Sequence, residues 1–243
     1  MQQKLLRKAG LLGIVLLTAG VALTGCIDEP NPPVLGQITS DVRFVHAVPN
    51  AGAMDIYADA DKIASNVGYK GYSQYLSVNS GNRFLRLVPA GQDTSNAVFR
   101  QLVSVRSLTQ ITMAFYNAAE DVQLMSTQER FTYADETSML QDSCDVKVLN
   151  LNSRGEAFGI SYEVSEGNYE VLLNPVDAGS LSAYNRVLAM PQSQNYYAAR
   201  TGGVVLLDSK FSSALETPGY RYTFVIFGDS GSLEVVKLQD EPK

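Results

Sequence analysis

Short apolar runs separated by turn-forming residues make up most of the chain from Asp41 onward. Residues 54–59 alternate between apolar and polar positions, whereas residues 222–227 form a longer continuous apolar run. Runs of this length, bounded by Gly, Asn, Asp and Ser, are typical of β-strands, and sustained helical periodicity is lacking. The pattern predicts an all-β protein.

Two halves of this region resemble each other, which indicates an internal repeat. Three pairs of segments match: 41–43 with 145–147, 80–84 with 166–170, and 112–124 with 223–235. Each half has about the length of an immunoglobulin-like sandwich. We therefore predict two tandem immunoglobulin-like β-sandwich domains, at residues 41–130 and 144–243, with a polar linker at 131–143.

The N-terminus has the layout of a secretory signal, with Lys4, Arg7 and Lys8 before an uncharged run at 9–23. The run is shorter than the ~20 apolar residues of a spanning helix. The alternatives are a retained transmembrane helix and an ordinary cleaved signal followed by an accidental cysteine.

The sequence Leu23-Thr24-Gly25-Cys26 resembles the lipobox of bacterial lipoproteins. This resemblance implies that residues 1–25 are removed and that acyl chains on Cys26 hold the exported protein to a membrane. Residue 27 is Ile rather than Asp, which in such proteins implies the outer membrane. Residues 26–40 then comprise the lipidated cysteine and a Pro-rich tether.

Composition narrows the possible partners. The formal net charge is −6, and removal of residues 1–25 would take away three positive charges and leave −9. An acidic chain of this kind argues against nucleic acid, which requires Lys and Arg at the phosphates. If Cys26 is acylated, Cys144 is the remaining cysteine, so we expect a buried structural thiol and no disulfide.

A second resemblance covers the first half of the repeat. The stretch Val42–Ala51, followed by Asp55-Ile56-Tyr57, resembles the opening of the family called domain of unknown function 4397. Residues 66–69 and 88–91 also fit that family, and the second half is similar to a divergent copy of it. The resemblance implies a β-sandwich on an exported, often lipid-anchored protein, and it implies no activity.

His46 is the single histidine, which excludes multi-histidine metal sites. A catalytic triad with Asp55 would need a nucleophile, and the chain lacks a G-x-S-x-G elbow. We expect His46 and Asp55 to be structural, with His46 bonded to Asp55 or to a turn amide. We predict no catalytic residue, metal or cofactor.

Asp55, Asp59 and Asp61 form a cluster of carboxylates in the sequence. The start of a calcium loop at Asp59 is not followed by the Gly and Glu that such a loop requires. A solvated hairpin turn is therefore the favoured interpretation.

Five tyrosines are candidates for binding, because exposed tyrosines on a sandwich stack on sugar rings or anchor protein partners. They are Tyr69, Tyr72, Tyr75, Tyr196 and Tyr197. The alternative for each is core or cross-strand packing.

The leading functional hypothesis is a non-enzymatic lipoprotein that binds a protein or glycan or acts as an envelope scaffold. The alternative is a hydrolase of an envelope polymer or glycan that uses carboxylates such as Asp55 and Asp59. A glycosidase needs two facing carboxyl groups in a cleft, and residues 196–218 are the longest insertion that could build one.

Overall fold

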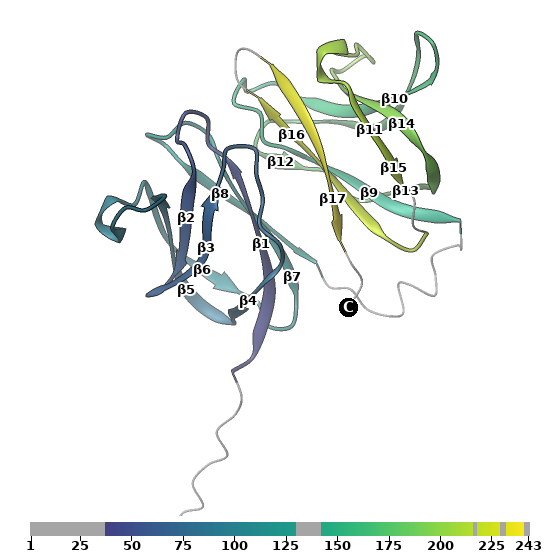
Figure 1. Ribbon diagram of the computed structural model, residues 1–243. Coiled ribbons are helices and arrows are strands. Elements are labelled where there is room, and N and C mark those ends of the chain that lie inside the picture. Colours follow the sequence, from purple (N-terminus) through teal and green to yellow (C-terminus); the bar gives the residue numbers. More distant parts are fainter. Residues whose placement is uncertain (1–36, 130–141, 216–217, 229–231, 241–243) are drawn as a thin grey trace, which may run out of the picture. The chain divides into compact units, whose positions relative to one another are not determined.

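The computed structural model describes residues 37–129, 142–215, 218–228 and 232–240 (Figure 1). Within these residues the protein is all-β, as predicted, and its helical structure consists of the 3-10 turns η1 (Thr94–Asn96) and η2 (Leu207–Ser209). The predicted signal, Cys26 and most of the linker lie outside the described residues. In the described ranges, no helix has the length and apolar character needed to cross a membrane.

The first sandwich consists of two four-stranded sheets, which Figure 1 shows in purple to teal. Its strands are β1 (Thr39–Ala47), β2 (Met54–Ala58), β3 (Asp61–Val67), β4 (Leu76–Asn79), β5 (Gly81–Pro89), β6 (Phe99–Val105), β7 (Gln110–Tyr116) and β8 (Gln123–Glu129). One sheet has the order β4-β1-β7-β8 and the other has the order β3-β2-β5-β6. The two sheets enclose an apolar core that includes Phe44, Ile56, Leu87 and Phe115.

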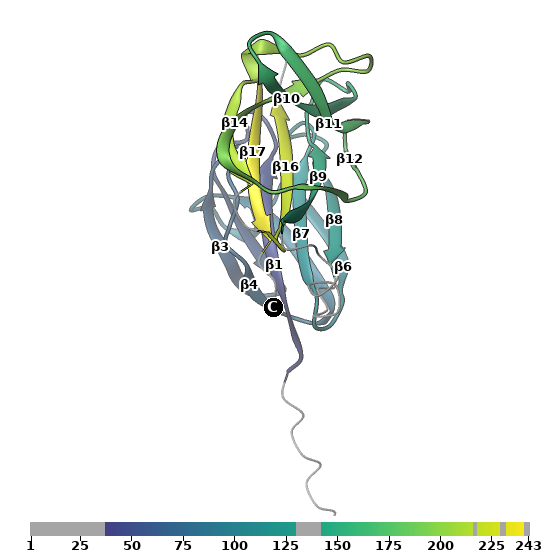
Figure 2. The ribbon, with the colours of Figure 1, turned by 90° about the vertical axis from the view of Figure 1, so that its right-hand side faces the viewer.

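The second sandwich is built from the remaining strands. These are β9 (Ser143–Asn150), β10 (Phe158–Ser165), β11 (Asn168–Val176), β12 (Ser180–Leu181), β13 (Asn185–Leu188), β14 (Met190–Ala199), β15 (Phe211–Leu215), β16 (Arg221–Gly228) and β17 (Leu233–Asp240). One sheet has the order β12-β9-β16-β17, with β13 also paired to β9, and the other has the order β11-β10-β14-β15. Figure 2 shows β16 and β17 side by side.

The two sandwiches have the same strand order. In each, the first strand lies parallel to a late strand, so that Asp41 pairs with Gln110 and Asp145 pairs with Arg221. The segments 41–43 and 145–147 therefore occupy equivalent strands, as the sequence match predicts.

One of the three predicted matches is wrong. Residues 80–84 open β5, an inner strand between β2 and β6, whereas residues 166–170 open β11, an edge strand in the place of β3. The Gly-Asn pair occurs in both because each turn needs a residue with positive φ, at Gly81 (99°) and Gly167 (75°). The first turn crosses from one sheet to the other, between β4 and β5, whereas the second closes the hairpin of β10 and β11. A turn requirement of this kind does not specify the position of a strand in its sheet.

A third apolar cluster joins the two sandwiches. It contains Val45, Ala47 and Ala114 from the first, and Leu149, Leu151, Val225, Phe227 and Leu238 from the second. Alternate residues of β1 thus face two different cores, and all eight residues of β9 are buried. The chain from Gln37 onward forms one compact unit.

Candidate ligand-binding site

The segment that follows β3 places Tyr72 at the surface. Its backbone is held along β1, because His46 N donates to Gly71 O at 2.9 Å and Ser73 N donates to Phe44 O at 2.8 Å. A side chain at Gly71 would put a Cβ 2.8 Å from Gly68 O, so this close approach requires glycine. The Tyr72 side chain then points outward and is 43% exposed.

Two surface hollows border Tyr72. The first, which we call the Arg43 hollow, has a volume of about 390 Å³ and is lined by Arg43, residues 72–75 and Gln239. The second, which we call the β3 hollow, has a volume of about 410 Å³ and is lined by residues of β3 and by residues 71–74 and Leu76. Both are lined by Tyr72, Ser73 and Gln74, so the two hollows are neighbours on either side of this tripeptide.

The charge of Arg43 is neutralised within the protein. Arg43 Nη2 lies 2.6 Å from Asp240 Oδ1 and 3.0 Å from Thr112 Oγ1, while Nη1 donates to Gln239 O at 3.1 Å. The side chains of Arg43 and Asp240 are 4% and 2% exposed. Removal of either partner would leave a buried charge without compensation.

Tyr75 completes this buried polar group. Its hydroxyl donates to Asp240 Oδ1 at 2.9 Å, and its ring centre lies 4.7 Å from Arg43 Cζ. Burial and the neighbouring Asp240 carboxylate raise the pKa of Tyr75 far above its usual range. The phenol therefore keeps its proton at neutral pH and remains a donor to Asp240.

Three amide side chains at these hollows are exposed and have no hydrogen bond to any other described residue. They are Asn66 in the β3 hollow, Gln74 in both hollows and Gln239 in the Arg43 hollow. Each amide offers two N–H donors and an acceptor oxygen. These groups are therefore available to a polar ligand.

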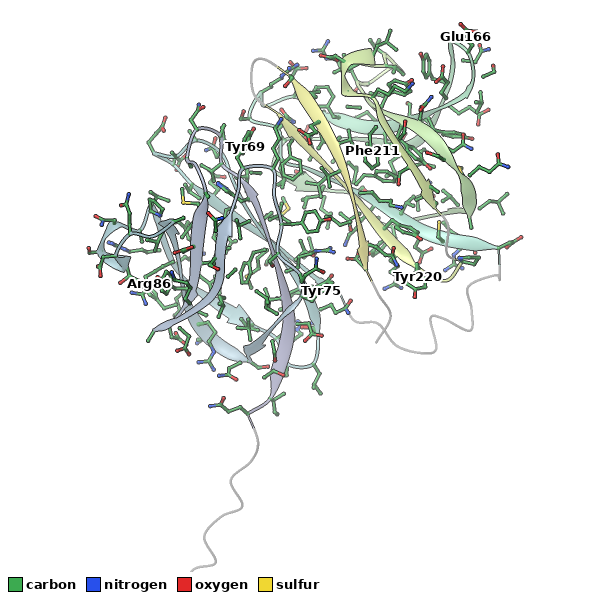
Figure 3. The ribbon with its side chains drawn as sticks, viewed as in Figure 1. Tyr69, Tyr75, Arg86, Glu166, Phe211 and Tyr220 are labelled. Carbon is green, nitrogen blue, oxygen red and sulfur yellow. The ribbon has the colours of Figure 1, made fainter. Side chains whose placement is uncertain are left out.

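The structure brings together Tyr72 and Tyr75, but it places the other three candidate tyrosines elsewhere. Tyr69 packs edge-on against His46 with ring centres 6.2 Å apart, away from Tyr75 (Figure 3). Tyr196 is fully buried against Phe224. Tyr197 is 4% exposed and lies in β14 beside β10. The expectation of a binding role is corrected for Tyr196 and Tyr197, which pack within their sandwich.

His46 is fully buried, and both of its ring nitrogens are engaged. Nε2 lies 2.8 Å from Gly52 O, and Nδ1 accepts from Val48 N at 3.3 Å. Burial lowers the pKa of His46, although the bond to Gly52 acts in the opposite direction. Of the two predicted kinds of partner, a backbone amide is found, at Val48 N, whereas Asp55 is held by other partners.

Asp55 is buried in β2 and accepts three hydrogen bonds. They come from Lys62 Nζ at 2.6 Å, Asn66 N at 2.9 Å and Gly91 N at 3.3 Å. Burial alone would raise the pKa of Asp55, but these donors outweigh it and lower the pKa. The carboxylate is a structural acceptor with its oxygens already occupied.

Asp59 lies in the hairpin turn between β2 and β3, with φ of 55°. It accepts from Phe84 N and pairs with Arg83, and these two contacts lower its pKa. The hairpin interpretation of this segment is confirmed. No set of three or more His, Cys, Asp or Glu side chains in the described ranges is arranged to hold a metal ion.

Cys144 is fully buried in β9, as expected, and burial raises the pKa of its thiol to about 11. Asp240 and Gln239 could not be recognised from the sequence as part of a site, because they lie at the end of β17, far along the chain from Arg43 and Tyr75. A signal was present for Arg43, which is a charged residue within the apolar run of β1.

Fold and site together define a protein of two β-sandwiches with two polar hollows beside an exposed tyrosine. Residues 40–160 match the family described as Domain of unknown function (DUF4397). This part of the chain belongs to that family, and the match runs from β1 into β10.

No curated protein matches the chain by sequence. Among solved structures, the chain is similar to a proposed cell adhesion protein from Bacteroides uniformis, at 10% identity and a TM-score of 0.25. That match covers 87% of this chain and 100% of the other. A TM-score this low does not establish a shared fold.

Proposed function

We propose that this protein is an exported lipoprotein that binds a ligand around Tyr72 and is anchored to the outer membrane by acyl chains on Cys26. The observation that carries the binding role is the exposed Tyr72 beside two hollows whose exposed amide side chains form no hydrogen bond within the described part of the chain. The lipobox-like sequence before Cys26 supports the anchor, since two or more acyl chains give stable attachment.

A catalytic role has less support. A hydrolase would need carboxylates that are free to exchange protons with a substrate. Asp55 is buried and accepts three hydrogen bonds, and Asp59 is paired with Arg83. Neither carboxylate lines the hollows that border Tyr72.

The anchor is tested by Cys26→Ser in cells that make the full chain. We expect the variant to leave the membrane fraction or to accumulate as an unprocessed precursor, because it lacks the sulfur that carries the acyl chain. Cell fractionation and the mass of the mature N-terminus measure this. Cys144→Ala is the matched control, because it removes the other cysteine and should remain acylated and membrane-bound. An unmodified mature N-terminus together with normal retention of Cys26→Ser would contradict the proposal.

A further inference from the structure

We propose that the Arg43 hollow and the β3 hollow act as one elongated site for an uncharged oligosaccharide that lies across the ring of Tyr72. This inference rests on the proposed binding function and specifies its ligand. It depends on three features of the site: its continuity, its charge and the chemistry of its exposed groups.

The site is elongated because the two hollows meet at the same residues. Their volumes of about 390 and 410 Å³ each fall within the range of small-molecule sites. Tyr72, Ser73 and Gln74 line both. A ligand with several linked rings can occupy both hollows, whereas a single small molecule would fill only one.

The charge of the site favours an uncharged ligand. The residues that line the β3 hollow carry no charged side chain. Arg43 is the one charged residue in the lining of the Arg43 hollow, and its guanidinium group is paired with Asp240 at 2.6 Å. An anionic or cationic ligand would therefore find no free opposite charge in the lining.

The exposed groups match a sugar. The faces of a sugar ring that carry C–H groups stack on an aromatic ring, and Tyr72 offers such a ring at 43% exposure. The amides of Asn66, Gln74 and Gln239 can each donate to and accept from hydroxyl groups. Neutral hydroxyl-rich ligands need this combination of one apolar platform and several two-way hydrogen-bonding groups.

An extended peptide fits less well. A peptide that adds to a sheet depends on unpaired backbone N–H and C=O groups. At the border of the two hollows, Gly71 O and Ser73 N are already bonded to β1. The side chains of Tyr72 and Gln74, rather than the backbone, are what this segment presents.

The test measures binding of neutral hexasaccharides to the lipidated mature protein in detergent, by calorimetry. The panel contains β-1,4-linked glucose, α-1,4-linked glucose and β-1,4-linked mannose, with oligogalacturonate as the charged comparison. We expect one neutral hexasaccharide to bind, with little dependence on salt because no charge pair is involved.

Three variants locate the site. Tyr72→Ala should weaken binding about tenfold or more, while Tyr72→Phe should keep most of the affinity, because the ring and not the hydroxyl provides the platform. Phe84→Ala is the matched control, because Phe84 is an aromatic residue of similar exposure, 40%, on β5. Its affinity should equal that of the wild type. Melting temperatures of all three confirm that they fold.

Two results would overturn the inference: no neutral hexasaccharide binding more tightly than about 1 mM, or equal losses for Tyr72→Ala and Phe84→Ala. Salt-sensitive binding of oligogalacturonate alone would also overturn it. Photo-crosslinking in cells distinguishes a failure of this inference from a failure of the proposed binding function. A photo-crosslinking residue replaces Gln74, and one in place of the exposed Arg106 is the control. A protein adduct specific to position 74 would reject the sugar but keep the binding role, and no adduct at either position would reject both.

Discussion

At the scale of single residues, His46 shows how a buried polar side chain of the first sandwich is held by hydrogen bonds. The imidazole of His46 joins the end of β1 to the following turn through Gly52 and Val48. The sequence allowed a structural role to be predicted for His46, because a lone histidine lacks the partners of a catalytic or metal site. It could not identify Gly52 as the partner, since that depends on the path of a turn in which Gly52 has φ of 69°.

We predict that His46→Ala lowers the melting temperature. Loss of one partner of a buried hydrogen bond costs ~1–3 kcal/mol, and each kcal/mol lowers the melting temperature by about 2–4 °C in a unit of this size. Thermal unfolding followed by circular dichroism measures this. A variant with the same melting temperature as the wild type would contradict the structural role of His46.

The same residue gives a dependence on pH. Because burial lowers the pKa of His46 below 6.5, the unfolded chain takes up a proton near pH 6.5 that the folded protein resists. The stability contributed by neutral His46 is therefore present above pH 6.5 and is lost as the pH falls through the lower folded pKa. Between pH 7.5 and 5.5 the melting temperature should fall more for the wild type than for His46→Ala, and equal slopes would count against this account.

The exposure of tyrosines shows what a single sequence cannot specify at this scale. Tyr72 and Tyr196 both occur among polar and apolar neighbours, yet one is 43% exposed and the other is fully buried. The difference arises because Tyr196 lies on an inner face of β14, whereas Tyr72 lies in a segment bonded edgewise to β1. The face of a strand is readable from alternation, but the path of an irregular segment is not.

At the scale of elements, Asp55 joins three parts of the chain. Its carboxylate connects β2 to Lys62 on β3, to the backbone at Asn66 and to the backbone at Gly91 after β5. The sequence predicted the strand and the hairpin around Asp55 because both are local. The contact with Gly91 is not local and could not be predicted in this way.

We predict that Asp55→Ala destabilises the protein by ~1–3 kcal/mol, because the amides of Asn66 and Gly91 lose their acceptor. Asp61→Ala is the control, because Asp61 is an exposed carboxylate at the start of β3, close to Asp55 in the sequence. Urea unfolding at pH 7 should separate the two variants. The lowered pKa of Asp55 means that its contribution is present above pH 3.8 and is lost as the pH falls through the folded pKa. Equal midpoints for the two variants at pH 7 would refute the role of Asp55.

At the scale of the whole molecule, the two sandwiches share buried groups. The third apolar cluster and the Arg43–Asp240 pair connect them, and a Cβ at Gly179 would lie 2.8 Å from the ring of Tyr116. The repeat in the sequence predicted two sandwiches, but not their contact. The residues that form this contact have the same apolar character as residues that face the core of a single sandwich. Only the structure shows that both faces of β1 and β9 are buried.

We predict that residues 41–135 alone fold as a β-protein with one cooperative transition, because this half has its own core. The fragment should melt at a lower temperature than the full mature chain, since Val45, Ala47 and Ala114 lose their cover. A fragment that is disordered by circular dichroism, while the mature chain is folded, would contradict this.

The variant Arg43→Gln, compared in the fragment and in the mature chain, tests the ion pair that connects the two sandwiches. Arg43→Gln should cost the mature chain ~3–5 kcal/mol, because it leaves the buried Asp240 carboxylate without its cationic partner. In the fragment, which lacks Asp240, the same change should have a much smaller effect. Similar losses in both would show that Arg43 acts within the first sandwich and not between the two.

The parallel pairing of first and late strands has a consequence for the making of the protein. Asp41 pairs with Gln110, 69 positions later, and Asp145 pairs with Arg221, 76 positions later. At synthesis rates of about 5–20 residues per second, β1 waits roughly 3–14 s for β7 to emerge. During that interval an apolar strand that will be buried on both faces lacks one neighbour, which exposes a pairing edge to other nascent chains. Among the described strands, β1 is thus the first to be made but gains its second neighbour only when β7, the seventh of the eight strands of its sandwich, has been made.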